Sequence, residues 1–255
     1  MKKYLSVFNL FARGSLYKVL ICFILMVSAE VIFFSIKLNE TLNLYYSDFQ
    51  LNQLETVIDN SLIELIFTVC FILITWILSV MGTEYGNVQT SYTIRRLQIS
   101  ERKYFLCQAT YNSLIYIIFW AVQTFTVFIL CTVYIYSAPE NMVGNQTLFL
   151  AFYRNGLLHS LMPISDIGLW IRNIILAIGM GFTTAEFPYK QRRKKFGATV
   201  IAYGLYIIIF FTKELSDTFN LFLTTIVSII IIGETLYTML LEDEEVATSD
   251  KNQKD

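Results

Sequence analysis

Ionisable side chains within long apolar stretches are the residues of this chain best suited to chemistry. Glu30 stands past the midpoint of the apolar stretch 16–36, and Arg172 stands near one end of the stretch 167–187. A charge at membrane depth is costly unless it is neutralised, paired or in contact with water. Two interpretations of Glu30 stay open: a substrate or proton contact facing a cavity, and a protonated or partnered side chain bonded to a neighbouring helix. Arg172 is a candidate partner for it, and a snorkelling arginine is the alternative.

Polar residues also recur along the stretch 105–136. Asn112, Tyr116, Gln123 and Thr126 follow one another at intervals of four, seven and three, which places them on one face of a helix. Such a face either lines a conduit or makes hydrogen bonds to other helices. The candidate conduit residues are therefore Glu30, Asn112, Tyr116, Gln123 and Arg172.

No catalytic constellation is present in the sequence. His159 is the single histidine, the four cysteines are isolated without a CxxC pair, and no GxxxxGK[ST] phosphate loop occurs. We therefore expect no catalytic residue, no metal site and no cofactor in this chain. If ATP drives the protein, a separate subunit would bind the ATP with its magnesium and hydrolyse it.

The composition predicts a membrane protein. Of 255 residues, 55% are hydrophobic and only 15% are charged, against about 25% charged in soluble proteins. This balance argues against a soluble enzyme, a nucleic-acid-binding protein and a disulfide-rich secreted domain.

Six apolar segments are long enough to be considered as spans of the ~30 Å hydrocarbon layer. We expect an all-α polytopic protein with one transmembrane domain over residues 1–241 and spans at about 16–36, 61–81, 105–136, 167–187, 196–212 and 219–241. The alternative count of five would put the two termini on opposite sides. Ala177 with Gly181, and Ala198 with Ala202, are small-xxx-small pairs that favour close packing of the fourth and fifth spans.

The distribution of basic residues predicts the orientation. With six spans and a cytoplasmic N-terminus, fifteen lysines and arginines lie inside and three lie outside, so both termini are expected in the cytoplasm. The first residues, up to Gly14 and Ser15, have the pattern of an interfacial helix, with a frayed leader as the alternative. Residues 147–162 predict an interfacial or re-entrant helix on the outer side, and residues 242–255 predict an acidic, disordered cytoplasmic tail.

The segment between the second and third spans has the most specific pattern. It runs M-G-T-E-Y-G-N-V-Q-T-S-Y-T-I-R-R-L-Q-I-S-E-R-K-Y-F-L-C-Q-A from Met81 to Ala109 and resembles the corresponding loop of type-2 ATP-binding cassette exporter permeases, including bacterial multidrug and bacteriocin-immunity members. In that family a Glu closes the second span, a Gly follows, and a short helix precedes an I-S-x-R-K turn. The matching residues are Glu84, Gly86, Arg95, Arg96, Leu97, Ile99, Ser100, Arg102 and Lys103; Gln98 stands where the family often has proline.

The resemblance implies a coupling helix from Tyr92 to Ser100 that docks into a groove on a cytoplasmic ATP-binding subunit. The partner-binding residues would be Glu84, Arg95, Arg96, Leu97, Ser100, Arg102 and Lys103. A solvated or phospholipid-binding basic loop is the alternative. The resemblance further implies a homodimer, or a heterodimer with a second permease, in a bacterial plasma membrane.

The expected function is thus the permease subunit of an ATP-driven exporter that moves an amphipathic cargo such as a peptide, a lipid-like molecule or a drug. Two other functions stay open. One is a membrane scaffold or sensor that recruits a partner through its basic inner loops. The other is an ion-coupled carrier that uses Glu30, although no convincing inverted repeat is present.

Overall fold

The protein is built from helices. The computed structural model describes residues 2–48, 53–83, 100–139, 143–144, 146–164, 166–195, 197–211 and 218–252, and every regular element among them is an α-helix. These helices are α1 (Lys2–Asp48), α2 (Leu54–Asn60), α3 (Ile63–Val80), α5 (Glu101–Ser137), α6 (Thr147–Arg154), α7 (Gly156–Leu161), α8 (Ile167–Arg192), α9 (Thr199–Phe211) and α10 (Thr218–Asn252). The predicted all-α class is confirmed.

Five of the helices, α1, α3, α5, α8 and α10, are long and apolar enough to cross a membrane. Four of them contain a predicted span, and α3 (Ile63–Val80) covers all but the ends of the span 61–81. The remaining predicted span, 196–212, forms α9, which has 13 residues. At a rise of ~1.5 Å per residue this helix is roughly 20 Å long, so it is shorter than the ~30 Å hydrocarbon layer. The count of six crossings therefore stays a prediction.

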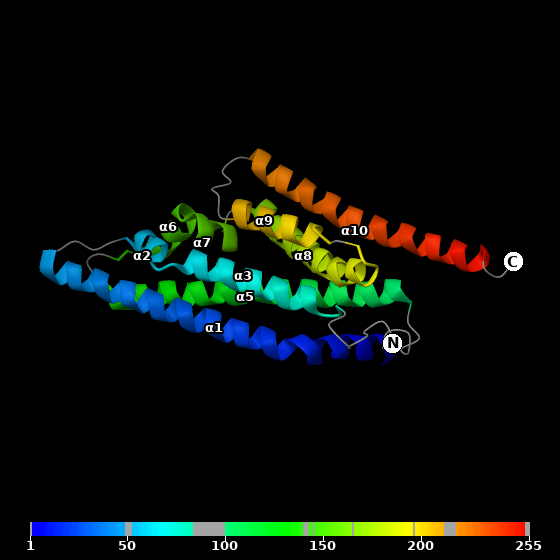
Figure 1. Ribbon diagram of the computed structural model, residues 1–255. Helices are drawn as coiled ribbons and strands as arrows, with labels where there is room; N and C mark the ends of the chain where they lie inside the picture. Colours follow the sequence, from blue (N-terminus) through cyan, green and yellow to red (C-terminus); the bar gives the residue numbers. More distant parts are fainter. Residues whose placement is uncertain are drawn as a thin grey trace.

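Helices α1, α3, α5, α8, α9 and α10 alternate in direction along one bundle (Figure 1). The start of α1 and the end of α10 lie at the same end of the bundle, which we call the terminal end. Helices α2, α6 and α7 gather at the opposite end, which we call the capped end. The amphipathic segment 147–162 thus forms two short helices, α6 and α7, that pack on the rest of the bundle.

The first residues do not form a separate interfacial helix. Helix α1 continues without interruption through Gly14 and Ser15 to Asp48. Gly14 lowers helix propensity by about 1 kcal/mol relative to alanine, but contacts with α5 hold this part of the helix. The Ser15 hydroxyl lies 2.7 Å from Tyr111 Oη, and the Phe8 and Phe11 rings pack against the Tyr111 ring. Tertiary packing therefore overrides the local signal.

The other end of the chain also differs in local structure from the sequence prediction. Helix α10 continues through the acidic segment to Asn252, where the sequence lacks apolar periodicity and predicts a tail without regular structure. The backbone of residues 242–252 is therefore an extension of the last candidate span.

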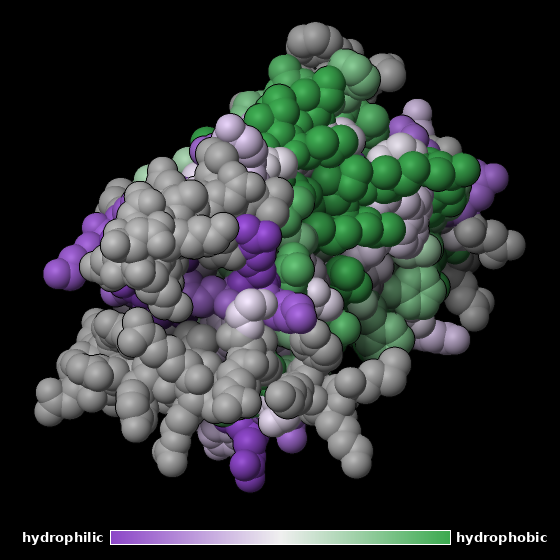
Figure 2. Space-filling model, turned by 90° about the vertical axis from the view of Figure 1, so that its right-hand side faces the viewer, coloured by the Kyte–Doolittle hydropathy of each residue, from purple (hydrophilic) through white to green (hydrophobic). Residues whose placement is uncertain are grey.

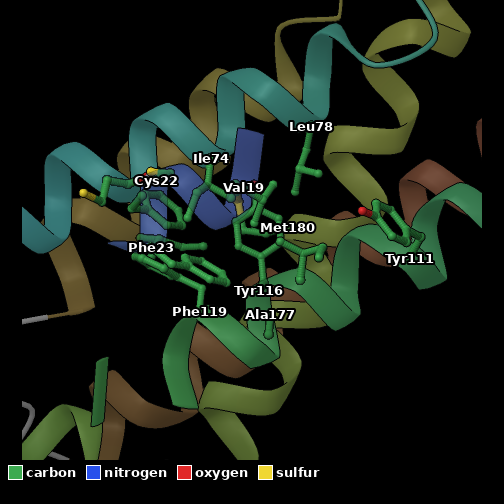
Figure 3. Close-up of a cluster of buried hydrophobic side chains, with 14 of the residues drawn as sticks. Val19, Cys22, Phe23, Ile74, Leu78, Tyr111, Tyr116, Phe119, Ala177 and Met180 are labelled. Carbon is green, nitrogen blue, oxygen red and sulfur yellow. The ribbon is translucent and has the colours of Figure 1, made fainter. Parts of the chain in front are cut away.

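Buried apolar side chains form two main clusters, one nearer each end of the bundle. The first core joins α1, α3, α5, α8 and α9, and Figure 3 shows part of it, with Val19, Cys22 and Phe23 meeting Ile74 and Phe119. The second core lies at the capped end and joins the nearby parts of α1 and α5 to α2, α6 and α7. Apolar packing therefore holds both the bundle and its cap.

Helices α5 and α8 approach each other most closely at Gly181. A Cβ atom on Gly181 would collide with the backbone and hydroxyl of Ser113 on α5. Two residues before it, on another side of α8, Gly179 leaves room for the Tyr203 side chain of α9. The glycines thus place α8 at the centre of the bundle, between α5 and α9.

Candidate functional site

Where α1 meets α5, two polar side chains lie at the junction of the two apolar cores. On α1, Glu30 lies one turn after Met26 of the first core and one turn before Phe34 of the second core. On α5, Gln123 occupies the same position between Phe119 and Val127. One turn of helix holds 3.6 residues, so residues four apart lie on the same face. Each polar side chain therefore occupies one position on a helix face whose neighbouring positions are apolar and buried.

Glu30 and Gln123 face each other across the contact between α1 and α5. Both side chains are completely buried. None of their four polar side-chain atoms makes a hydrogen bond of normal geometry to any residue that the structure describes. Buried polar atoms usually have a partner, so this pair is the most unusual polar feature of the bundle.

Arg172 does not pair with Glu30, contrary to the interpretation of these two residues as partners. Its guanidinium donates from Nε and Nη2 to Asn173 Oδ1, at 3.2 and 3.0 Å, and lies 5.5 Å from the centroid of the Phe211 ring. Asn173 in turn donates from Nδ2 to the Ser160 carbonyl at 2.8 Å. Both side chains are buried, so Arg172 and Asn173 tie α8 to α7 rather than to α1.

The other two candidate conduit residues make bonds between helices. Asn112 donates to Thr184 Oγ1 of α8 at 3.0 Å, and Tyr116 donates to Thr75 Oγ1 of α3 at 2.9 Å. On the polar face of α5, these two residues therefore make hydrogen bonds to other helices, which is one of the two uses expected from the spacing; a conduit along this face stays a prediction. The partners Thr75, Thr184 and Ser160 carried no signal in the sequence, since isolated hydroxyl residues are common in apolar helices.

A small apolar cavity of about 60 Å³ lies beside Tyr116. Its walls come from α3, α5, α8 and α9, with aromatic side chains dominating and Asn173 as a polar member. Phe211 lines this cavity and also underlies the Arg172 guanidinium. The space suits the end of an apolar chain close to a buried cation.

The predicted coupling loop lies largely outside the residues that the structure describes, which include neither Glu84 nor Arg95, Arg96 and Leu97. Ser100 is described and immediately precedes the first turn of α5. Arg102 and Lys103 belong to that first turn. The structure therefore describes the two ends of the loop, where it joins α3 and α5.

Both anchor points of this loop are held by the basic end of α8. Arg192 donates from Nη1 to the Gly82 carbonyl at 3.0 Å, just before the loop, and its guanidinium lies 5.4 Å from the centroid of the Tyr104 ring. Arg193 Nη2 lies 2.9 Å from Glu101 Oε2, just after the loop. Gln108 adds a bond to the Met81 carbonyl at 2.9 Å. Residues Met81, Gly82 and Glu101, with Arg192 and Arg193, are called the anchor clamp below.

The anchor clamp lies at the terminal end of the bundle. Viewed from that end, hydrophilic residues gather beside apolar helix flanks (Figure 2). Nearby, the buried Glu186 carboxylate is held by Lys190 Nζ at 2.7 Å and by the Thr199 hydroxyl. This end therefore combines a fixed backbone frame with several cationic groups.

The capped end has its own polar contact. Asn155 accepts from the backbone N–H of Leu158, which caps α7, and its Nδ2 donates to Asp59 Oδ1 at 2.6 Å. Partial burial raises the pKa of the Asp59 carboxyl, the bond from Asn155 opposes that shift, and the nearby Glu64 and Glu55 charges add to it. The contact fixes α2 against α7.

No family model, curated protein or solved structure matches the chain. The resemblance to exporter permeases therefore depends on the segment from Met81 to Ala109 and on the expected topology.

Proposed function

We propose that this chain is the permease subunit of an ATP-driven exporter, with ATP bound and hydrolysed by a separate cytoplasmic subunit. The observation that carries the proposal is the anchor clamp: the loop that resembles a coupling loop leaves and re-enters the bundle at two points that α8 binds together. Such a frame supports a loop that transmits movement to the bundle.

The clamp gives the loop a mechanical connection to the bundle. Movement imposed on residues 84–99 would pass through Gly82 and Glu101 to Arg192 and Arg193, and so to the whole of α8. Because α8 packs against α3, α5, α9 and α10, its movement would carry the bundle as a rigid body, which is a common form of conformational coupling.

The cargo is proposed to be amphipathic. The bundle offers apolar surfaces on most helices, a small aromatic cavity, and the buried cation of Arg172 next to it. We place the conduit at the interface between two permease chains, either two copies of this chain or this chain and a related one.

The first test is co-purification of the tagged chain from its native membrane in mild detergent. Wild type should retain a P-loop ATPase in stoichiometric amount, and Arg95→Glu combined with Arg96→Glu should abolish that association while the protein still inserts. Lys251→Glu with Lys254→Glu is the matched control, because it reverses the same number of charges in another segment predicted to be cytoplasmic. Equal ATPase recovery from the Arg95 and Arg96 variant would remove the coupling-loop proposal.

A second test separates docking from coupling. Arg192→Ala with Arg193→Ala leaves the loop sequence intact, so we expect the ATPase to remain bound while transport-linked ATP hydrolysis falls at least several-fold. Full coupling in this variant would contradict the role of the clamp. Failure to recover any ATPase with wild type, under conditions that preserve a known transporter complex, would instead favour the scaffold function.

A further inference from the structure

Within the described part of the chain, Glu30 and Gln123 are buried together without hydrogen-bond partners of normal geometry, and an ionised Glu30 carboxylate does not account for this. The two side chains come from different helices, meet between the two apolar cores and are shielded from solvent. Both oxygens of Glu30 and both polar atoms of Gln123 lack a partner of normal geometry among the residues described. Four unsatisfied polar atoms in one place call for a ligand or for a different protonation state.

Charged groups near Glu30 do not supply the compensation. Helix α1 packs against α2, α3 and α5. On α3 the Cys70 thiol interacts electrostatically with Glu30, and α5 has no charged residue after Lys103. On α2, Glu55 and Asp59 face Arg154 and Asn155 instead. A carboxylate at this position would therefore be buried in an apolar region without a counter-ion, which is strongly unfavourable.

A carboxylic acid and a primary amide complement each other completely. The acid O–H donates to the amide oxygen, and the amide N–H donates to the acid carbonyl, so one ring of two hydrogen bonds uses all four atoms. An ionised Glu30 could accept only one of these bonds, and its second oxygen would face the oxygen of Gln123. The neutral acid is thus the form that satisfies both side chains.

We infer that Glu30 is a proton-binding site in which the neutral carboxyl pairs with the Gln123 amide and joins α1 to α5 between the two apolar cores. The ring would form through the side-chain torsion angles of two groups that already interact with each other. The site takes a proton as its ligand, and it is independent of any ATPase subunit.

Infrared spectroscopy of the full chain in lipid bilayers at neutral pH tests this inference. Wild type should show the carbonyl band of a protonated carboxylic acid, sensitive to exchange of H₂O for D₂O. Glu30→Gln should remove that band. Glu40→Gln is the matched control on the same helix, because Glu40 is exposed and paired with Lys37 at 2.8 Å; it should leave the band unchanged.

Gln123→Leu tests the pairing while leaving Glu30 in place. Without the amide donor, the acid carbonyl loses a hydrogen bond, so its band should move to higher frequency. This variant also decides the matter if Glu30→Gln does not accumulate in membranes. A wild-type spectrum without an acid band, a band that survives Glu30→Gln, or a band that Gln123→Leu leaves in place would each overturn the inference.

Discussion

Helices α8 and α10 are both candidate membrane spans, yet they occupy opposite environments. In the most apolar segment of α8, 56% of the residues are buried, against 17% in the corresponding segment of α10. Helix α8 has the lowest mean hydropathy of the five candidate spans and contains Arg172, Asn173 and Glu186, all of them buried. Helix α10 instead presents Phe222, Ile229 and Ile230 outward.

The difference shows how a membrane bundle distributes its polar residues. Lipid cannot satisfy polar groups, so a helix that carries them is stable only where other helices provide partners. The long interfaces of α8 with α5 and α10 supply that enclosure. A helix at the edge, such as α10, buries one face against a neighbouring helix and depends on an apolar outer face for the rest of its surface.

The largest difference in stability is expected when a glycine near the middle of each helix is replaced by alanine, which adds one methyl group. Gly181→Ala should destabilise the protein by about 1–3 kcal/mol, because the added Cβ collides with the Ser113 backbone. Gly233→Ala on α10 has no atom within 4 Å of the new Cβ and should stabilise the helix by up to about 1 kcal/mol. Thermal unfolding in mild detergent measures both. If both variants shifted the unfolding temperature in the same direction, the packing around Gly181 would be no tighter than the packing around Gly233.

An intermediate effect is expected from single polar groups. Asn173→Leu removes the bonds to Ser160 and Arg172 and should cost about 1–2 kcal/mol. Thr225→Val on α10 removes only a hydroxyl bond to Leu221 within the same helix, so its effect should stay within about 0.5 kcal/mol. The same unfolding assay compares the two, and a larger loss for Thr225→Val would reverse the comparison.

The smallest effect concerns the pH dependence of the contact between Asp59 of α2 and Asn155, which caps α7. Because the pKa of Asp59 is raised in the folded protein, its neutral form is favoured there, and stability from this residue is present at low pH and lost as pH rises through the raised pKa. Wild type should therefore gain slightly in thermal stability from neutral to mildly acidic pH, relative to Asp59→Asn. The variant keeps an oxygen that accepts from Asn155. Identical pH profiles would show that Asp59 contributes nothing to the cap.

Long-range contacts explain what the sequence could and could not predict. The five long helices could be predicted from apolar stretches because hydropathy depends only on neighbouring residues in the sequence. The pair Ala177 and Gly181 correctly marked a close contact, but the residue it meets, Ser113, belongs to α5 and not to α9. Glu30 was recognisable as a buried acid, whereas Gln123 as its neighbour depends on the register of α1 against α5. Likewise, the break expected at Gly14 was overridden by aromatic contacts with Tyr111.

The length of α1 has a mechanical consequence. Its 47 residues extend roughly 70 Å at ~1.5 Å per residue, more than twice the ~30 Å thickness of the hydrocarbon layer. A helix of this length that crosses the layer without strong tilt projects well beyond the lipid tails. A continuous helix moves as a stiff unit. A force on its projecting part would therefore tilt the whole helix and act on the contact between Glu30 and α5.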